Sequence, residues 1–365
     1  MVFSTTEELW CLKPFKMVRL TKILYATSSI GLGHVTRDYH IKKFLNHDVI
    51  WLTSGNALNY LKIKNEKIET ISYELKNLGS YLGDKIIRNC EVKINPLNSY
   101  SFYKAVKFNS EKIKEGIDFD SYDLIVADEF WEFLLLDRLP KEKSIFITDF
   151  TRITYNKMGF FEKYVIPKLN NGLRERLNKK FSLRINLSLW DRDKDYINLG
   201  PSFTHDFNEK NGRNGDSSKN EYILINIGGT DAAKNMAEKI KERLEKNKVE
   251  TIIIGSSKYF NKNPFKLMEK SKAIITLSGY GGIVETNILN KPAIFLYIDN
   301  HFEHLENAKL MENRKGYRVF SCKDLLRIDL LKTLNEITKE NTEPLKFNDS
   351  AIEISKIIDN FNSRY

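Results

Sequence analysis

A chain of 365 residues, of which 41% are hydrophobic and 12% aromatic, is too long for one ordinary core, so we expect two globular domains. No run of about eighteen apolar residues occurs, which argues against a membrane-spanning helix. Residues 1–16 carry acidic side chains and no long apolar stretch, which argues against a signal peptide and leaves Met17 as a candidate natural start. The three cysteines, Cys11, Cys90 and Cys322, are widely separated, which suits a reducing cytoplasm and supplies no metal-ligand cluster. We therefore expect a cytoplasmic protein, with peripheral contact at the inner face of the membrane left open.

The net charge of +10 does not decide the class of partner. The 58 basic and 48 acidic residues are interleaved, and many lysines lie in glutamate-rich segments such as 239–246, where i,i+4 pairs form on a solvated helix face. A mild positive field favours a nucleotide diphosphate or an anionic membrane surface. We expect no nucleic-acid partner, but a basic protein that binds nucleic acid or a membrane surface remains an alternative from a different class.

Short apolar segments alternate with helical stretches along the chain, a pattern typical of parallel α/β sheets. Met236, Ile240 and Leu244 repeat every four residues, so the helix that carries them should face a sheet. Each half of the chain predicts one doubly wound parallel sheet, and two such Rossmann-like sheets would face each other across a cleft. The predicted strands are 23–27, 49–53, 124–127 and 145–148 in the first half, and 222–227, 251–254, 273–277 and 293–297 in the second.

A polar segment separates the two halves. Residues 198–202 contain Gly200-Pro201, and residues 208–220 are rich in Asn, Gly, Ser and charge, with almost no apolar residue to bury. We place the domain boundary there, with a first domain over residues 1–204 and a second over residues 205–365.

The segment 28–37 places two glycines and a histidine where the first strand should turn into a helix. Gly31 and Gly33 let a ligand approach the backbone closely. The free N–H groups at the start of the helix suit a phosphate or a developing anion. His34 carries the side chain best suited to moving protons near neutral pH, so it is the principal catalytic candidate.

Two further glycine-rich turns follow strands of the second half, at 227–231 and 278–282. Each offers backbone N–H groups and the start of a helix to an anion. Neither ends in Gly-Lys-Ser/Thr, so neither is a P-loop. Downstream, polar residues of 302–308 begin a helix after the strand 293–297, where they either bind a polyhydroxylated ligand or simply cap the helix.

In this order the motifs resemble those of glycosyltransferases of the GT-B fold. The Gly-x-Gly-His turn, the Gly-Pro linker and the Gly-Gly-Thr turn contribute, and the most specific segment consists of Ser278-Gly279, Glu285, Lys291-Pro292, Glu303-His304 and Asn307-Ala308. This segment resembles the donor-binding region of the bacterial N-acetylglucosaminyl transferase that completes the lipid-linked peptidoglycan precursor, and that of UDP-glucuronosyltransferases. The resemblance implies an α/β fold with an acceptor-binding first domain and a nucleotide-sugar-binding second domain.

The resemblance also implies a role for each matching residue. His34 would be the general base that activates the acceptor hydroxyl, and Gly31 and Gly33 would admit the acceptor and the diphosphate. Glu285 would accept hydrogen bonds from the ribose hydroxyls. The other donor-binding residues would be Gly229, Thr230, Gly281 and Gly282 at the phosphates, Ser278 in the same segment, and Glu303, His304 and Asn307 at the transferred sugar.

The implied activity is transfer of a sugar from a UDP-sugar co-substrate to an acceptor hydroxyl, with no other cofactor and no metal. The acceptor would be a glycan, a lipid-linked molecule or a small molecule. Glu303-His304 stands where the family usually has Asp-Gln or Gln-Gln, and the Gly-Leu-Gly-His turn departs from the longer glycine-rich loop of the peptidoglycan enzyme. Gly-x-Gly-His-Val-x-Arg also resembles nucleotide-sugar hydrolases of the same fold, in which the histidine activates water. A hydrolase or epimerase is therefore the alternative.

Three further patterns bear on the site. His34 needs an orienting carboxylate, for which Asp128 is the first candidate and Asp149 the second, each at the end of a first-half strand. Asp191-Arg192-Asp193 matches an Asp-x-Asp metal motif, but it lies in a charged run that is better interpreted as a solvated surface. Residues 100–107 mix aromatic residues with lysines, which favours a half-buried helix face over a nucleic-acid or membrane contact.

Overall fold

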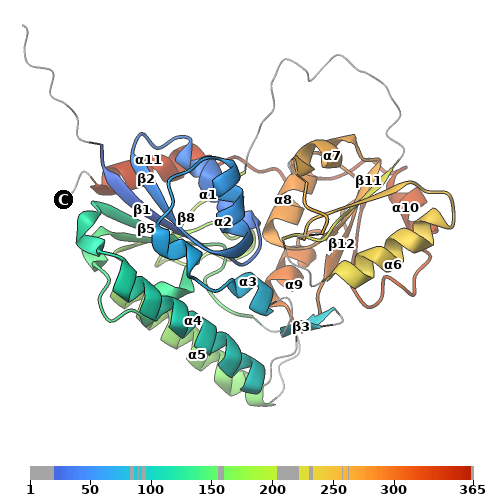
Figure 1. The fold of residues 1–365 in the computed structure, drawn as a ribbon. Helices are drawn as coiled ribbons and strands as arrows, with labels where there is room; N and C mark the ends of the chain where they lie inside the picture. The colour runs from blue at the N-terminus through green and yellow to red at the C-terminus, as the bar shows by residue number, and fades with distance from the viewer. Residues whose placement is uncertain are drawn as a thin grey trace, which may run out of the picture.

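The structure is a computed structural model that describes residues 20–82, 86–88, 90–92, 96–154, 160–203, 222–229, 233–256, 258–261 and 263–362. Within these residues the chain forms two α/β domains, each built on its own parallel sheet (Figure 1). The predicted fold class is confirmed. In the part of the chain that is described, no helix combines the length and the hydropathy needed to cross a bilayer.

The first domain contains a six-stranded sheet in the order β2-β1-β5-β6-β7-β8, with parallel pairing throughout. Helices α1, α2 and α11 bury apolar side chains on one face of this sheet, and α4 and α5 do so on the other. The strands are β1 (Lys22–Thr27), β2 (Asp48–Leu52), β5 (Leu124–Asp128), β6 (Ser144–Thr148), β7 (Leu183–Asn186) and β8 (Ile197–Asn198). The helices are α1 (Gly33–Lys42), α2 (Gly55–Ile63), α3 (Leu78–Tyr81), α4 (Pro96–Gly116), α5 (Phe160–Lys180) and α11 (Ala351–Asn362).

The second domain contains a five-stranded sheet in the order β10-β9-β11-β12-β13, again parallel. Met236, Ile240 and Leu244 of α6 are buried against β9, which confirms the predicted helix face. The strands are β9 (Ile223–Asn226), β10 (Thr251–Ile254), β11 (Ala273–Leu277), β12 (Ala293–Tyr297) and β13 (Tyr317–Ser321). The helices are α6 (Lys234–Glu245), α7 (Pro264–Lys270), α8 (Tyr280–Ile288), α9 (Phe302–Lys309) and α10 (Leu330–Ile337).

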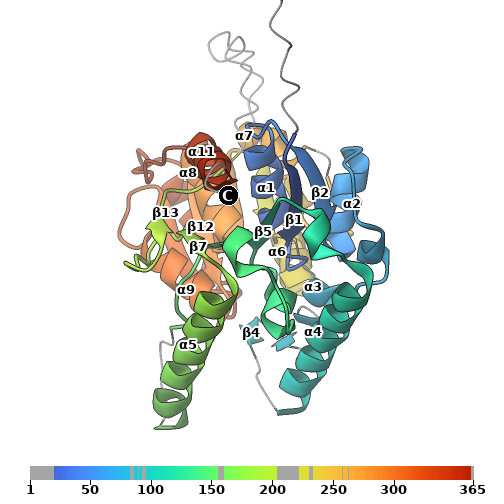
Figure 2. The ribbon, with the colours of Figure 1, turned by 90° about the vertical axis from the view of Figure 1, so that its left-hand side faces the viewer.

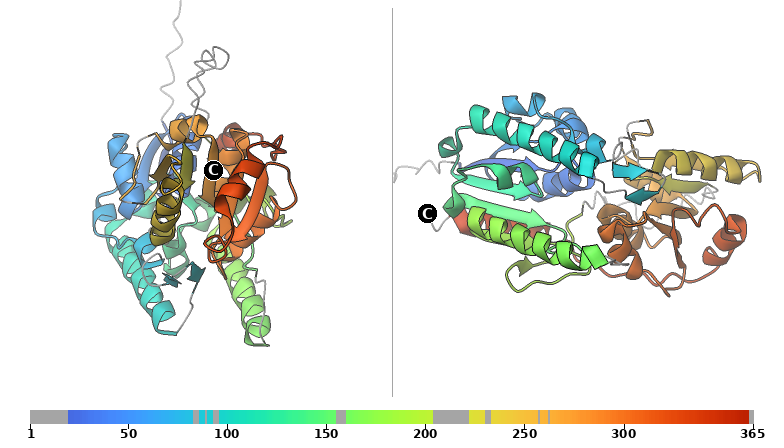
Figure 3. Two further views of the ribbon diagram at one scale, coloured as in Figure 1. Left: turned by 90° about the vertical axis from the view of Figure 1, so that its right-hand side faces the viewer. Right: turned by 90° about the horizontal axis from the view of Figure 1, so that it is seen from below.

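Every strand predicted from the sequence is present, with ends within one residue of the expected ones. The sequence analysis missed β7, β8, β13 and a short antiparallel hairpin of β3 (Ile87–Arg88) and β4 (Glu91–Val92). β8 and β13 lie at sheet edges, where burial is partial and the sequence lacks a continuous apolar run. Figures 1 and 3 show the hairpin beside the second domain, although it lies between α3 and α4 in the chain.

The last helix returns to the first domain, where Figure 2 shows it close to α1. Ala351, Ile354 and Ile358 of α11 are fully buried in the core beside β1. The core of the first sheet therefore includes residues from beyond the boundary expected near residue 205. That boundary itself falls among residues 204–221, outside the described residues.

Candidate active site

The turn after β1 opens toward the second domain. Gly31 has φ +80°, a backbone conformation that favours glycine, and no atom would lie within 4 Å of a Cβ added at Gly31 or at Gly33. Helix α1 begins at Gly33, and Leu32 before it supplies no side-chain cap. The first N–H groups of α1 are therefore left without a side-chain acceptor from the N-cap, as expected at a turn that receives an anion.

His34 and Asp128 lie in contact at the carboxyl ends of adjacent strands. Thr27 of β1 pairs with Asp128 of β5, and the turn carries His34 back over that strand end. The Nδ1 atom of His34 lies 3.1 Å from Oδ1 of Asp128. Nη2 of Arg37, which can only donate, lies 2.9 Å from the same Nδ1 and 2.5 Å from Asp128 Oδ1. In the tautomer with the proton on Nδ1, His34 and Arg37 both donate to Asp128, and the Nε2 lone pair can accept a proton. Of the two aspartates considered from the sequence, only Asp128 contacts His34 among the described residues.

The Arg37 guanidinium forms hydrogen bonds with both Asp128 and Asp149. Arg37 donates from Nε to Asp128 Oδ2 at 2.6 Å and from Nη1 to Asp149 Oδ2 at 2.9 Å, and its side chain is only 3% exposed. Burial opposes ionisation of Asp128, but the neighbouring Arg37 and His34 outweigh it and hold the pKa of this carboxyl below its usual range. Asp128 is therefore an ionised acceptor for His34 at neutral pH. The sequence analysis gave Arg37 no role, although its i+3 spacing from His34 on one helix face was a usable signal.

Glu129 completes the buried acidic group beside His34. It has φ +44°, uncommon for a residue with a side chain, and its Oε1 accepts hydrogen bonds from Thr148 Oγ1 at 2.8 Å and from the Asp149 N–H at 2.9 Å. Its other oxygen lies 3.8 Å from Nε2 of His34. Burial, and then the charge of Asp149, raise the pKa of Glu129 well above its usual value. Asp149 thus contacts Arg37 and Glu129 rather than His34.

The glycine turns of the two domains touch. A Cβ added at Gly229, after β9, would lie 2.4 Å from the Leu32 nitrogen and 2.8 Å from the Gly31 Cα. No side chain can occupy that position unless one of the two turns shifts, so glycine is required by the close approach. The predicted phosphate turn therefore lies against the predicted acceptor-side turn. Thr230, expected to contact the same phosphates, lies outside the described residues.

In the turn after β11, some of the residues predicted to bind the donor have a structural role and others are open to a ligand. The Ser278 hydroxyl is buried within hydrogen-bond distance of two carbonyl oxygens, Leu296 at 3.0 Å and His304 at 2.8 Å, which ties β12 to α9. A Cβ at Gly282 would lie 2.4 Å from the Leu277 carbonyl oxygen, so this glycine is required by packing. Nothing lies within 4 Å of a Cβ at Gly281, which leaves Gly281 with the open approach that a ligand contact needs.

Glu285 lies on α8 at a small pocket between the domains. Gly33 and Arg37 of the first domain line this pocket together with Tyr280, Gly281 and Glu285 of the second. Burial raises the pKa of Glu285 to about 7. The pocket therefore brings the predicted ribose-binding carboxylate close to the helix that carries His34.

The predicted sugar-binding residues lie together at the start of α9. Glu303 accepts the N–H of Tyr280 at 3.0 Å, and its Oε1 is 3.4 Å from the Asn307 amide nitrogen. Burial, with the charge of Asp149, raises the pKa of Glu303 to about 8. Burial lowers the pKa of His304 well below its usual value, and its ring stacks on His301 with centroids 4.0 Å apart. The Nδ1 atom of His304 has no hydrogen-bond partner among the described residues.

The described residues contain no group of three His, Cys, Asp or Glu side chains that could hold a metal ion. Asp191 accepts the Thr151 hydroxyl, and Asp193 pairs with Arg174. The Asp-x-Asp carboxylates therefore form hydrogen bonds and ion pairs within the first domain.

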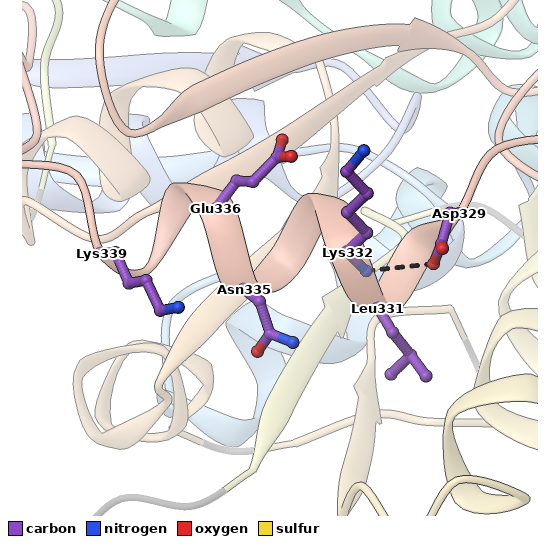
Figure 4. A pocket seen from close by; sticks show the side chains of 6 residues that line it. All are labelled: Asp329, Leu331, Lys332, Asn335, Glu336 and Lys339. Atoms are coloured by element: carbon purple, nitrogen blue, oxygen red, sulfur yellow. Dashed lines mark hydrogen bonds between the residues drawn. The ribbon is translucent and has the colours of Figure 1, made fainter.

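A shallow hollow over α10 lies apart from these residues (Figure 4). Its lining consists of polar side chains at the surface of the helix together with the half-buried Leu331. The bond drawn there is the cap from the Lys332 N–H to Asp329 at 3.1 Å. The hollow is the solvated face of an amphipathic helix and contains no residue of the predicted site.

Comparisons with known proteins agree with this geometry. Residues 201–361 match the model of the glycosyltransferase family 28 C-terminal domain. The fold is similar to that of the glycotransferase of kitacinnamycin, with a TM-score of 0.55 and 13% identity over 94% of this chain and 99% of that one. It is also similar to the calicheamicin glycosyltransferase CalG4, with a TM-score of 0.53 and 12% identity over 95% of this chain and 99% of that one. No curated protein sequence matches the chain. The expected resemblance is confirmed.

Proposed function

We propose that this chain, whose residues 201–361 match the glycosyltransferase family 28 C-terminal domain, is a glycosyltransferase that moves a sugar from a UDP-sugar to an acceptor hydroxyl without a metal ion. The observation that carries the proposal is the His34–Asp128 pair, 3.1 Å apart, beside the Gly229 turn of the family 28 domain. A proton acceptor and a phosphate-binding turn thus meet at one interface.

In this mechanism His34 Nε2 takes the proton of the acceptor hydroxyl as its oxygen attacks the anomeric carbon of the donor. The bond from that carbon to the diphosphate oxygen breaks, and UDP leaves with its charge. Asp128 orients the imidazole and stabilises the imidazolium that forms. Backbone N–H groups at the Gly229 turn and at the start of α8 stabilise the leaving diphosphate.

Glu285 binds the ribose hydroxyls of the donor. A half-buried carboxylate that accepts two hydrogen bonds suits this role, and its position on α8 directs it into the pocket shared by the two domains. Glu303, His304 and Asn307 contact the transferred sugar, and the free Nδ1 of His304 offers it a polar atom. The preference for uridine rests on the resemblance around Glu285.

The first test is thermal stability measured against UDP, UDP-sugars and the other nucleotides, because a ligand that binds the folded state raises Tm according to its affinity. We expect UDP and UDP-sugars to raise Tm and the other nucleotides to have little effect. Incubation of the active donor without an acceptor separates transfer from hydrolysis or epimerisation. Rapid, stoichiometric release of free sugar or its epimer would contradict transfer.

We also propose that the acceptor side contacts an anionic membrane surface. Leu97, Tyr100 and Tyr103 of α4 and Tyr164 and Leu169 of α5 are exposed. Figure 2 shows α4 and α5 projecting from the same end of the molecule, and exposed lysines accompany these residues. Co-sedimentation with anionic but not with neutral vesicles, reduced by Tyr100→Ser with Tyr103→Ser, is the expected result. Equal sedimentation with both vesicles would contradict it.

A further inference from the structure

The β3–β4 hairpin joins the two domains. It leaves the first domain between α3 and α4, and its end pairs with the second domain just beyond β12. The Val92 N–H donates to the Asp299 carbonyl at 2.8 Å, and the Asp299 N–H donates to the Cys90 carbonyl at 3.0 Å. Ile87 and Val92 pack on the apolar core of the second domain. The hairpin is therefore a contact between domains that is built into the chain.

The hairpin brings Cys90 to Cys322. Cys90 lies in the short turn between β3 and β4, and Cys322 directly follows β13. Both side chains belong to one buried cluster. Both residues also hydrogen-bond to the same short stretch after β12, with the Cys322 N–H donating to the Tyr297 carbonyl at 2.9 Å and the Asp299 N–H donating to the Cys90 carbonyl at 3.0 Å. The next residues along each segment, Glu91 and Lys323, form an ion pair at 2.9 Å. The two segments therefore run together for more than one residue, and both cysteines have free thiols.

We propose that Cys90 and Cys322 form a reversible disulfide that ties the hairpin of the first domain to the second domain. The oxidant is a low-molecular-weight disulfide. The Cys90 thiolate attacks one sulfur of this oxidant, a mixed disulfide forms, and the other oxidant sulfur leaves as a thiolate. Cys322 then loses its proton and attacks the Cys90 sulfur, which releases the second oxidant thiolate. The cysteines lose two protons and two electrons, and the oxidant becomes two thiols.

The surroundings of the two sulfurs assign their order of reaction. The neighbouring Cys322 thiol lowers the pKa of Cys90, burial and the charge of Asp299 oppose this, and Lys323 and Lys239 add to the lowering. The neighbouring Cys90 thiol and then burial raise the pKa of the Cys322 thiol. Cys90 is also the more exposed of the two, at 8% against 1% for Cys322. Cys90 is therefore the attacking sulfur, and Cys322 is the one that closes the bond.

A bond between residues 90 and 322 would span the linker and most of both domains. Such a long loop restricts the unfolded chain strongly, so the oxidised protein should be more stable than the reduced one. It would also limit separation of the domains, because the hairpin and the end of β13 belong to different domains. Neither effect depends on the identity of the donor or the acceptor.

The experiment treats the full chain with oxidised glutathione and then maps disulfide-linked peptides by mass spectrometry. We expect one linked pair containing Cys90 and Cys322, reversed by dithiothreitol, and a rise in Tm of about 5 °C on oxidation. Cys11→Ser serves as the matched control, because it removes the third cysteine of the chain and keeps Cys90 and Cys322, so this variant should retain the linked pair and the rise in Tm. Cys90→Ser and Cys322→Ser should each lose both the linked pair and the rise in Tm.

Recovery of Cys90 and Cys322 as free thiols after oxidation would overturn the proposal. A linked pair that leaves Tm unchanged would overturn it as well, because the bond would then not tie the domains. These readouts do not use a nucleotide sugar, so failure of the proposed glycosyl transfer would leave them unaffected.

Discussion

The guanidinium of Arg37 packs against the ring of Tyr280, with Cζ 5.1 Å from the ring centroid. Arg37 belongs to the helix that carries His34, and Tyr280 opens the helix that carries Glu285. A cation over an aromatic face is attracted by the ring, more strongly when both groups are away from water. The same guanidinium bonds Asp128. The contact therefore links the proposed base of the first domain to the donor-binding helix of the second.

Replacing the proposed base tests its role directly. His34→Ala removes the proton acceptor and leaves the donor side intact, so kcat should fall by about 10²- to 10⁴-fold. Affinity for UDP, measured by calorimetry, should change by less than about twofold. A variant with wild-type turnover would refute the assignment of His34.

Arg37→Lys should lower kcat by about 10- to 100-fold, because a lysine cannot make the bidentate contact that orients Asp128. The acid limb of the kcat–pH profile should also move to higher pH, since a lysine keeps the positive charge but replaces only part of the guanidinium hydrogen bonds that help to keep Asp128 ionised. Tyr280→Phe keeps the ring and should remain close to wild type. Arg152→Lys, at an exposed arginine that pairs with Asp191, is the matched control. An unshifted profile in Arg37→Lys would contradict the positioning role.

Binding of UDP should depend on pH through Glu285. Burial raises the pKa of this carboxyl to about 7, so it is largely protonated at pH 6 and largely ionised at pH 8. The ionised form accepts both ribose hydrogen bonds, so affinity should rise several-fold over this range. Calorimetry at several pH values measures the change. Glu285→Gln should bind more weakly and without the pH dependence, and a wild-type pH profile in this variant would count against the ribose contact.

Gly229→Ala should disrupt the contact between the domains. Its Cβ would lie 2.4 Å from a backbone nitrogen of the first domain, so one turn has to move. We expect weaker UDP binding and about a 10-fold or larger loss of kcat, with both domains still folded by circular dichroism. Gly172→Ala, where a Cβ meets nothing within 4 Å, is the control. Equal behaviour of the two variants would mean that the close approach has no functional role.

The stability that Asp349 contributes at the start of α11 should decrease at acid pH. Burial opposes ionisation of Asp349, but His40 and two backbone N–H groups outweigh it and lower its pKa. Because the folded pKa lies below the unfolded one, the stabilisation is present above about pH 4 and is lost as pH falls through the folded pKa. Asp349→Asn should lower the free energy of unfolding by about 1–3 kcal/mol at pH 7 and by less at pH 3. Denaturant titrations at both pH values measure this, and an equal loss at both would contradict the His40 pair.

The amino-acid sequence is enough to predict the two parallel sheets and the motifs at their carboxyl ends. Buried central strands need continuous apolar runs, and tight turns that approach another backbone need glycine. Both features can therefore be identified from a short stretch of sequence. Edge strands such as β13 have a weaker sequence pattern, because part of their surface stays exposed. The sequence therefore predicts the Gly-x-Gly-His turn and ranks Asp128 before Asp149 as the partner of His34, but it does not show that the two side chains are in contact.

Which side chains come into contact depends on how the strands and the two domains are arranged in space. Residues 34 and 128 come together because β1 and β5 are neighbours in the sheet, and residues 37 and 280 because the two domains pack. The hairpin contact of Cys90 and the return of α11 likewise join residues far apart in the chain. A local sequence pattern indicates the strand or helix to which a residue belongs and the face of that element that is buried. Contacts across elements depend on strand order and domain packing, which are not encoded within any one short segment.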